Sequence, residues 1–267
     1  AMIFRVLGPL EVAVEGAAEK PTAPKVRWTL ALLLLHANRV VGHSSIIYEL
    51  WGETPPCSAV ATAQTYVYQI RKKYQRRLDQ IGWGELVETR PSGYVLRAEE
   101  SEIDAQVFER LSEQARASLT AGHTEQAARQ LREALALWRG RALADVSAGS
   151  VLAPHVIHLE KSRMRTLRLR IFADQRLGRY RELLPELQFL AAANPIDEWF
   201  HQQLMIALVE TGRRADALEA YHRLQSTLGA ELGVRPSPRL HKLQHDVLTG
   251  VPWTRGPQTE LDLTVPT

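Results

Sequence analysis

Residues 58–78 read SAVATAQTYVYQIRKKYQRRL, and this stretch joins a helical pattern to an uneven distribution of charge. Its apolar side chains recur every three or four positions, as they do along one side of a helix: Val60, Ala63, Val67, Ile70 and Tyr74. No acidic residue occurs at 55–78, whereas five of the seven residues at 71–77 are Lys or Arg. The stretch therefore predicts a helix with one buried side, a polar N-terminal half and a basic C-terminal half.

Such a helix has two interpretations. A solvated helix with a basic end explains the composition, and so does a helix that lies in the major groove of DNA with phosphates on either side. The order of the neighbouring elements favours the second interpretation. A short helix expected near 44–51 precedes the stretch, and two short strands at 86–90 and 94–97 follow it around a Pro-Ser-Gly turn.

The N-terminal segment completes this order of elements. Apolar and polar residues alternate at 10–15, which predicts a strand that pairs with 2–7. Pro24 opens a further helix that extends to His36. Two strands, three helices and a hairpin predict a mixed, α+β winged helix-turn-helix domain at 2–100.

Length and composition exclude several classes of protein. The chain has 267 residues, 45% of them apolar and 24% charged, which is the balance of a soluble globular protein with room for two domains. Cys57 is the one cysteine, so a disulfide framework and a cysteine-rich zinc site are excluded. The longest apolar runs have six residues, far short of the ~20 that a membrane span needs. No signal region opens the chain, and we expect a cytoplasmic protein without a membrane partner.

The remainder of the chain, 103–250, is expected to be helical. Gly122, Gly178 and Gly212 each precede a polar residue that opens a helix, and the last two are 34 residues apart, which is the tetratricopeptide period. The 56 residues between Gly122 and Gly178 predict an additional helix near 151–177. A generic helical bundle is the alternative. We expect a flexible tail at 251–267.

A basic stretch within this helical part needs its own interpretation. Lys161, Arg163, Arg165, Arg168 and Arg170 lie close together in the sequence. They do not fall on one narrow stripe of a helix, so we expect a solvated or partly paired helix. A second contact with DNA is the alternative.

These motifs, in this order, resemble a known family. Residues 2–97 are similar to the DNA-binding domain of OmpR-type response regulators, in Leu50-Trp51-Gly52, in Ile70-Arg71 and in the turn that ends at Gly93-Tyr94. Residues 2–250 resemble the Streptomyces antibiotic regulatory proteins, which join such a domain to an all-helical bacterial transcriptional activation domain. Ile103-Asp104 with Phe108 matches the entry to that second domain.

The resemblance assigns candidate DNA contacts to individual positions. Phosphate contacts are expected from Lys25, Arg27, Trp51, Lys72, Lys73 and Arg76. Base contacts are expected from Thr65, Tyr66, Gln69 and Arg71, with Thr62 on the same side of the helix. The hairpin is expected to place Arg90 in the minor groove, with Thr89 and Ser92 beside it. Residues alone leave Trp51 either a core aromatic or a phosphate contact, and the resemblance favours the contact. Tyr68 and Gln69 stand where response regulators often carry two arginines, so base preference cannot be transferred.

The expected function is activation of transcription. The resemblance implies binding to direct repeats in the promoter DNA of an antibiotic gene cluster, with tandem self-association on the repeats and recruitment of RNA polymerase through its sigma subunit. About six phosphate contacts predict that log K falls with log salt at a slope of roughly −5. A repressor, a small-molecule-sensing regulator and a protein-interaction scaffold are the alternatives.

An enzyme is not expected. The sequence has neither a phosphate-binding Gly-Lys loop nor a dinucleotide fingerprint, and no receiver domain supplies an Asp for phosphorylation. His241 and His245 are four apart, as zinc ligands can be, but no adjacent Glu or third ligand accompanies them. We therefore expect no catalytic residue, no metal and no cofactor.

Overall fold

The computed structural model describes residues 2–14, 16–19, 23–80 and 84–251, with the backbone alone at 2, 17, 76–78 and 80. The chain divides into two compact units. The first unit comprises Ala1–Thr120 and Arg129–Arg168, and the second comprises Ala121–Ala128 and Leu169–Thr267. Among the described residues, no helix is both long and apolar enough to cross a membrane.

The first unit opens with a small antiparallel sheet. Strand β1 (Met2–Arg5) pairs with β2 (Glu11–Val14), as the sequence predicts, and β2 pairs with a third strand, β3 (Ala17–Glu19), which the sequence does not predict. Helix α1 (Pro24–Leu35) follows, and its leucines are fully buried at 30, 32, 33 and 34. This helix contacts α2 (His43–Trp51), α3 (Ala59–Gln80) and the hairpin strand β6 (Gly93–Leu96), so it needs an apolar surface on several sides.

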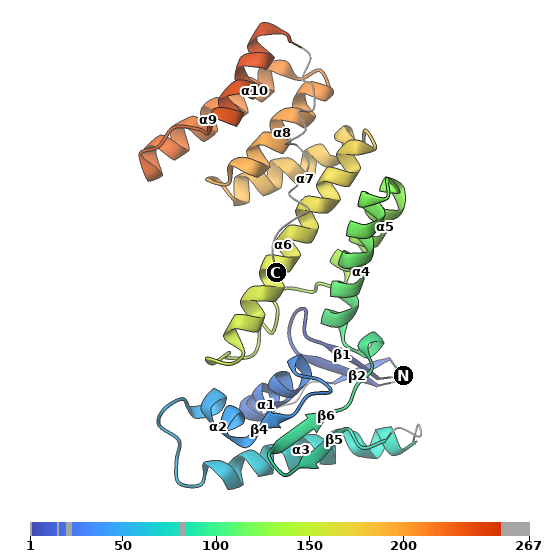
Figure 1. The fold of residues 1–267 in the computed structure, drawn as a ribbon. Coiled ribbons are helices and arrows are strands. Elements are labelled where there is room, and N and C mark those ends of the chain that lie inside the picture. The colour runs from blue at the N-terminus through green and yellow to red at the C-terminus, as the bar shows by residue number, and fades with distance from the viewer. Residues whose placement is uncertain (1, 15, 20–22, 81–83, 252–267) are drawn as a thin grey trace. The chain divides into compact units, whose positions relative to one another are not determined.

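Helices α2 (His43–Trp51) and α3 (Ala59–Gln80) form the helix-turn-helix (Figure 1). Gly52, at φ 63°, ends α2 in a conformation that favours glycine. The buried stripe of α3 differs from the prediction at its first position. Val60 is 51% exposed and Ala59 is buried instead. Because Ala59 lies four positions before Ala63, it takes the first position of the buried stripe in place of Val60.

The hairpin consists of β5 (Val87–Arg90) and β6 (Gly93–Leu96), which confirms the predicted strands. A two-residue strand, β4 (Val41–Gly42), pairs with the other side of β6, and it is too short to show a sequence pattern. A Cβ atom at Gly93 would lie 1.9 Å from the carbonyl oxygen of Val41, so only glycine permits this close approach.

The helical part of the first unit includes α4 (Asp104–Thr120), reached through the 3-10 helix η1 (Glu100–Glu102), and parts of α5 (Thr124–Ala136) and α6 (Ala153–Arg176). The prediction of an additional helix between Gly122 and Gly178 is not how the structure uses this length. Helix α6 is present, but Gly178 joins it directly to the next helix, so α6 is a partner in a helix pair and not an addition between pairs. The additional length lies largely in the segment 137–152, which has no regular helix.

Segment 137–152 packs on the winged helix. The backbone N–H groups of Arg139 and Leu143 donate to the carbonyl oxygens of Leu7 and Val6, at 2.8 and 2.9 Å. Asp145 accepts a hydrogen bond of 2.7 Å from the backbone N–H of Leu10. Part of the helical half of the sequence therefore completes the fold of the N-terminal half.

Glu49 of α2 is the most heavily bonded residue of this contact. Its carboxylate is buried and accepts from the indole N–H of Trp28 and from the backbone N–H groups of Gly149, Val151 and Leu152, at 2.6 to 3.0 Å. A Cβ atom at Gly149 would lie 2.6 Å from the carbonyl oxygen of Glu49. A buried charge with this many donors is well compensated, and the loss of its acceptors would leave several donors without partners.

The second unit is a stack of antiparallel helices. It contains α7 (Tyr180–Ala193), α8 (Glu198–Glu210), α9 (Arg214–Leu232) and α10 (Pro238–Thr249), and each of the first three contacts its successor. The predicted turn glycines have left-handed backbones, with φ of 80° at Gly122, 75° at Gly178 and 79° at Gly212. This is a tetratricopeptide-like helical fold, as expected. The predicted tail at 251–267 lies, apart from Val251, outside the described residues.

The bonds of Glu49 predict a large effect of a small substitution. Glu49→Gln keeps the size of the side chain but places an NH₂ group where backbone N–H groups need an acceptor. We expect the free energy of unfolding to fall by about 3 kcal/mol. Chemical denaturation measures it, with Glu113→Gln on the exposed side of α4 as the control. Equal stability of the two variants would contradict this role of Glu49.

Asp104 predicts a pH dependence. Burial raises its pKa to about 6, although the backbone N–H groups of Val6 and Leu7 donate to its carboxylate at 2.8 and 3.1 Å. Because the pKa is higher in the folded chain than in the unfolded chain, folding takes up a proton at pH 5 that it does not take up at pH 7.5. As the pH falls from 7.5 to 5, the free energy of unfolding of the wild type should therefore increase by ~1.4 kcal/mol relative to that of Asp104→Asn. Denaturant titrations of both proteins at both pH values measure it, and a constant difference contradicts it.

Candidate nucleic-acid interface

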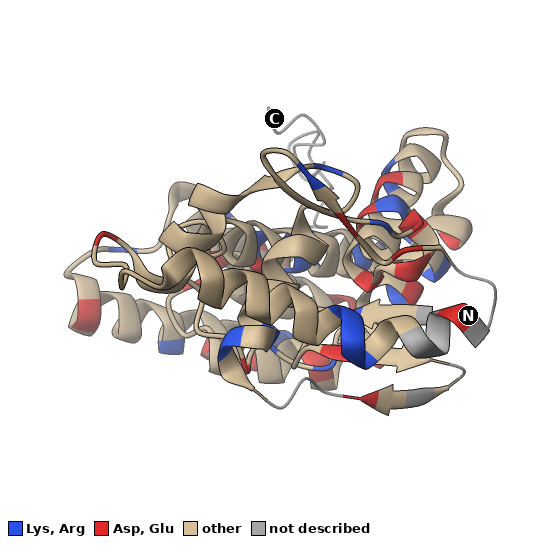
Figure 2. Cartoon of the chain, turned by 90° about the horizontal axis from the view of Figure 1, so that it is seen from below, with Lys and Arg blue, Asp and Glu red and all other residues tan. Residues whose placement is uncertain are grey.

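Helix α3 turns one side to the core and the opposite side to solvent. Ala63, Val67, Ile70 and Tyr74 are buried among residues of α1, α2 and the hairpin. The exposed positions follow one another along the other side: Ala61, Gln64, Thr65, Tyr68, Gln69 and Lys72. Figure 2 shows the basic and acidic residues from this side of the first unit. A polar helix surface of this kind, with a basic end, fits the width of a DNA major groove.

Three residues support the N-terminal half of α3. The rings of Trp51 and Tyr66 are stacked, with centroids 6.4 Å apart and planes at 19°. The ammonium group of Lys25 lies 4.4 Å from the centre of the Trp51 ring and donates to the carbonyl oxygen of Leu50. Trp51 and Tyr66 are half-buried, so each combines a packing contact with an accessible edge.

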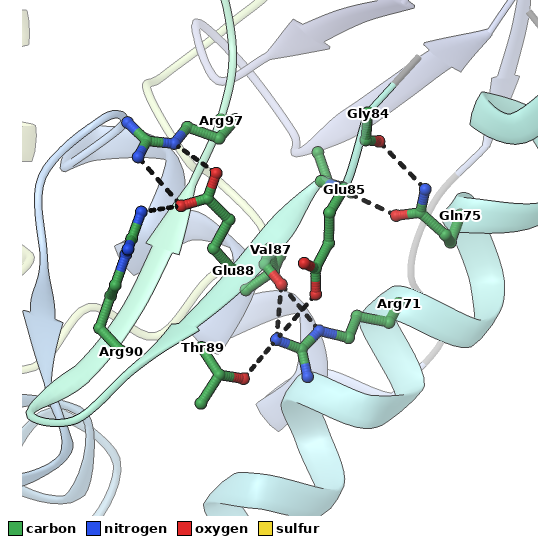
Figure 3. A network of polar contacts seen from close by, with 10 residues as sticks. Arg71, Gln75, Gly84, Glu85, Val87, Glu88, Thr89, Arg90 and Arg97 are labelled. Atoms are coloured by element: carbon green, nitrogen blue, oxygen red, sulfur yellow. Dashed lines mark hydrogen bonds and ion pairs between the residues drawn. The ribbon is translucent and has the colours of Figure 1, made fainter. Parts of the chain in front are cut away.

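Arg71 connects α3 to the hairpin (Figure 3). Its guanidinium donates through Nε, at 2.8 Å, and through Nη2 to the carbonyl oxygen of Val87, and through Nη2 to the hydroxyl of Thr89 at 2.8 Å. The same group lies 3.5 Å from the carboxylate of Glu85 and 5.8 Å from the centre of the Tyr94 ring. The side chain expected to read a base is therefore directed at β5 and β6.

Gln75, one turn further along α3, repeats this connection. Its amide donates to the carbonyl oxygen of Gly84 at 3.1 Å and accepts from the backbone N–H of Leu86 at 3.0 Å (Figure 3). Arg71 and Gln75 lie four residues apart on the same side of the helix, so together they hold the beginning of β5 along α3. We call these two residues the helix–hairpin bracket.

The hairpin carries its own ionic network. Glu88 accepts from Arg97 through two bonds of 2.9 Å and also pairs with Arg90 (Figure 3). The bonds from Arg97, with a smaller part from Arg90, lower the pKa of Glu88, and the bond to Glu88 raises the pKa of Arg97. Arg90 remains exposed at the end of β5, next to the turn at Pro91-Ser92.

The other predicted contacts fall into four groups. Lys72, Gln69, Thr65 and Ser92 are exposed, and Thr62 and Lys73 are half-buried. Arg27 is directed inward, with its guanidinium 3.3 Å from both the carboxylate and the carbonyl oxygen of Asp145. The side chain of Arg76 lies outside the described residues.

Two exposed residues of α3, Gln64 and Tyr68, are not among the contacts predicted from the sequence. The two residues are four positions apart, so they lie in one row on the exposed part of the helix. A complete helical projection of the sequence would have included them. The bracket was missed for a different reason. Its partners at 84–87 are largely backbone groups, which every residue carries, so residue types in the sequence do not indicate them.

The basic stretch of α6 is partly paired. Arg163 lies 4.8 Å from the centre of the Trp138 ring and donates to the carbonyl oxygen of Gly140. Arg170 is buried and pairs with Glu186 and Asp174. Lys161 and Arg165 are exposed. No group of three or more metal-ligating side chains that could hold an ion occurs within the described part of the chain.

These features define a winged helix-turn-helix protein of the OmpR type whose chain continues into a tetratricopeptide-like helical domain. Residues 103–248 match the bacterial transcriptional activator domain family. The regulatory protein DnrI of Streptomyces peucetius is 41% identical over 254 residues, which cover 94% of this chain and 93% of DnrI. The regulatory protein AfsR of Streptomyces griseus is 34% identical over 93% of this chain, although this chain spans only 24% of AfsR.

A solved structure has the same fold. EmbR of Mycobacterium tuberculosis, in complex with a low-affinity phosphopeptide, is 31% identical and superposes with a TM-score of 0.86 over 95% of this chain and 66% of EmbR. The chain belongs to the Streptomyces antibiotic regulatory protein family of transcriptional regulators.

The bracket predicts that Arg71 matters for the fold. Arg71→Ala removes the donors that hold Val87 and Thr89, and we expect the free energy of unfolding to fall by ~1–3 kcal/mol. Lys72→Ala, at the neighbouring exposed position, should change it by less than ~0.5 kcal/mol. Denaturation of the two variants measures the difference. Equal stability would show that the bracket is not needed for folding.

Proposed function

We propose that this protein activates transcription of a secondary-metabolite gene cluster by binding double-stranded promoter DNA through α3. The observation that carries this proposal is the exposed side of α3, which is held outward by the buried stripe on one side and by the bracket on another. The family supports the class of target genes, and the bacterial transcriptional activator domain at 103–248 supports activation.

The exposure of each side chain refines its proposed role. Thr65 and Gln69 are proposed to contact base edges from the exposed side of α3, with Tyr66 and Thr62 at its border. Lys72, Lys73, Arg76 and Lys25 are proposed to contact phosphates, with Trp51 beside Lys25. Arg90 is proposed to enter the minor groove, with Thr89 and Ser92 near it.

Two predicted contacts take other roles in this proposal. Arg71 acts as a positioning residue, because its Nε and Nη2 donors are bonded to Val87 and Thr89 of β5. Arg27 belongs to the pair with Asp145. Four basic side chains remain for phosphates, so log K should fall with log salt at a slope of roughly −3.6.

The family supports the proposed partners. We propose tandem binding of two copies to direct repeats, because head-to-tail contacts suit repeats in the same orientation. Recruitment of RNA polymerase, through its sigma subunit, is assigned to the helical domain. We propose that the protein works in the cytoplasm, needs no cofactor and catalyses no reaction.

A titration at several salt concentrations tests DNA binding. The probe is a duplex from the promoter next to the chain's own gene, with a shuffled duplex as the reference. Lys72→Ala should weaken binding to both duplexes and reduce the salt slope by about 1. Lys161→Ala, on the exposed side of α6, should leave both unchanged. Equally weak binding of the wild type to both duplexes would contradict the proposal and favour a protein-interaction scaffold.

Transcription with purified RNA polymerase tests activation separately. On the bound promoter, the protein should increase the number of transcripts. Inhibition alone would identify a repressor, and a response only after addition of a small molecule would identify a ligand-sensing regulator.

A further inference from the structure

Tyr68 is the most exposed tyrosine among the described side chains, at 60% of its surface. No hydrogen bond, ion pair or ring contact of Tyr68 is seen in the described part of the chain, whereas Tyr66, two residues earlier, is stacked on Trp51. Large apolar rings in contact with water are common as single residues, so exposure alone decides nothing. The position of this ring on α3 is what distinguishes it.

Tyr68 lies in the middle of the exposed side of α3. Gln64 and Thr65 are one turn before it, and Lys72 is one turn after it. Arg71, the other neighbour one turn later, is held by the bracket and directed at the hairpin. Tyr68 is thus an aromatic side chain whose exposed neighbours, one turn away on either side, are polar or basic.

The chemistry of the major groove offers one apolar partner at this place. Base edges there present hydrogen-bond donors and acceptors, together with the 5-methyl group of thymine. An aromatic ring on the central row of a reading helix gains by covering that methyl group, since both leave water. Its phenol oxygen stays at the border of the contact, where water or a polar group can reach it.

We propose that Tyr68 is a specificity-determining residue, which packs its ring against the 5-methyl group of a thymine in the operator. The inference rests on the proposed binding of DNA by α3. It adds a residue and a base feature that the resemblance does not supply, because the position of Tyr68 is where response regulators often carry arginine.

A scan with deoxyuridine tests the contact. The probe is the duplex site mapped by footprinting in the promoter next to the chain's own gene, with thymines replaced one at a time by deoxyuridine, which lacks only the methyl group. For the wild type, one replacement should weaken binding about fourfold, the effect of one buried methyl group. Tyr68→Ala should weaken binding to the unmodified duplex and should no longer respond to that replacement.

Two further variants identify the part of the side chain that acts. Tyr68→Phe keeps the ring and should behave as the wild type does, including its response to deoxyuridine. Phe189→Ala removes another exposed aromatic ring, on α7, and should change neither affinity nor response. Because Tyr68 and Phe189 are exposed, both alanine variants should fold, and thermal melting of the full chain checks this.

The outcomes separate the inference from the function on which it rests. If the wild type binds the site selectively but no thymine is sensitive, or if Tyr68→Ala keeps the sensitivity, the methyl contact is wrong and DNA binding stands. Loss of affinity in Tyr68→Phe assigns the contact to the hydroxyl group and overturns the inference too. If the wild type selects no duplex at all, the proposed function fails first.

Discussion

The burial of one side of α3 is the constraint on which the first unit depends. Val67, Ile70 and Tyr74 are almost fully buried, so the helix cannot rotate without exposing them. The bracket of Arg71 and Gln75 fixes the hairpin against the same helix through the backbone at 84–87. The exposed side of α3 and the hairpin are therefore positioned together, and the polar side of α3 is held toward solvent.

The second constraint lies where the helical half of the sequence meets the winged helix. The match to the activator domain family begins at residue 103, yet residues 129–168 belong to the same compact unit as α1, α2 and α3. Glu49, on helix α2, which precedes α3, accepts from three backbone N–H groups at 149–152. We propose that the sequence domains 2–100 and 103–250 meet in one folding unit here, so that a change in segment 137–152 reaches the helix-turn-helix through a buried carboxylate.

Periodic patterns carried most of the prediction from sequence. The strands at 2–7 and 10–15, the three helices, the hairpin and the glycine turns all follow from spacing and turn residues. The stripe of α3 was wrong at Val60, because adjacent apolar residues at 59 and 60 fit the period equally. Strands β3 and β4 were missed, since two or three residues form no pattern. The contacts of Arg71 and Glu49 could not be predicted from the sequence, because most of their partners are backbone groups that only the tertiary fold brings together.

We propose an arrangement in which α3 presents its outward side to the major groove while Arg71 stays on the hairpin. A crystal or cryo-electron microscopy structure of the full chain on its operator duplex tests it most directly. We expect Tyr68 and Lys72 to face the groove, with Arg71 still bonded to the carbonyl oxygen of Val87. An Arg71 guanidinium on a base edge, with the bond to Val87 broken, would contradict it.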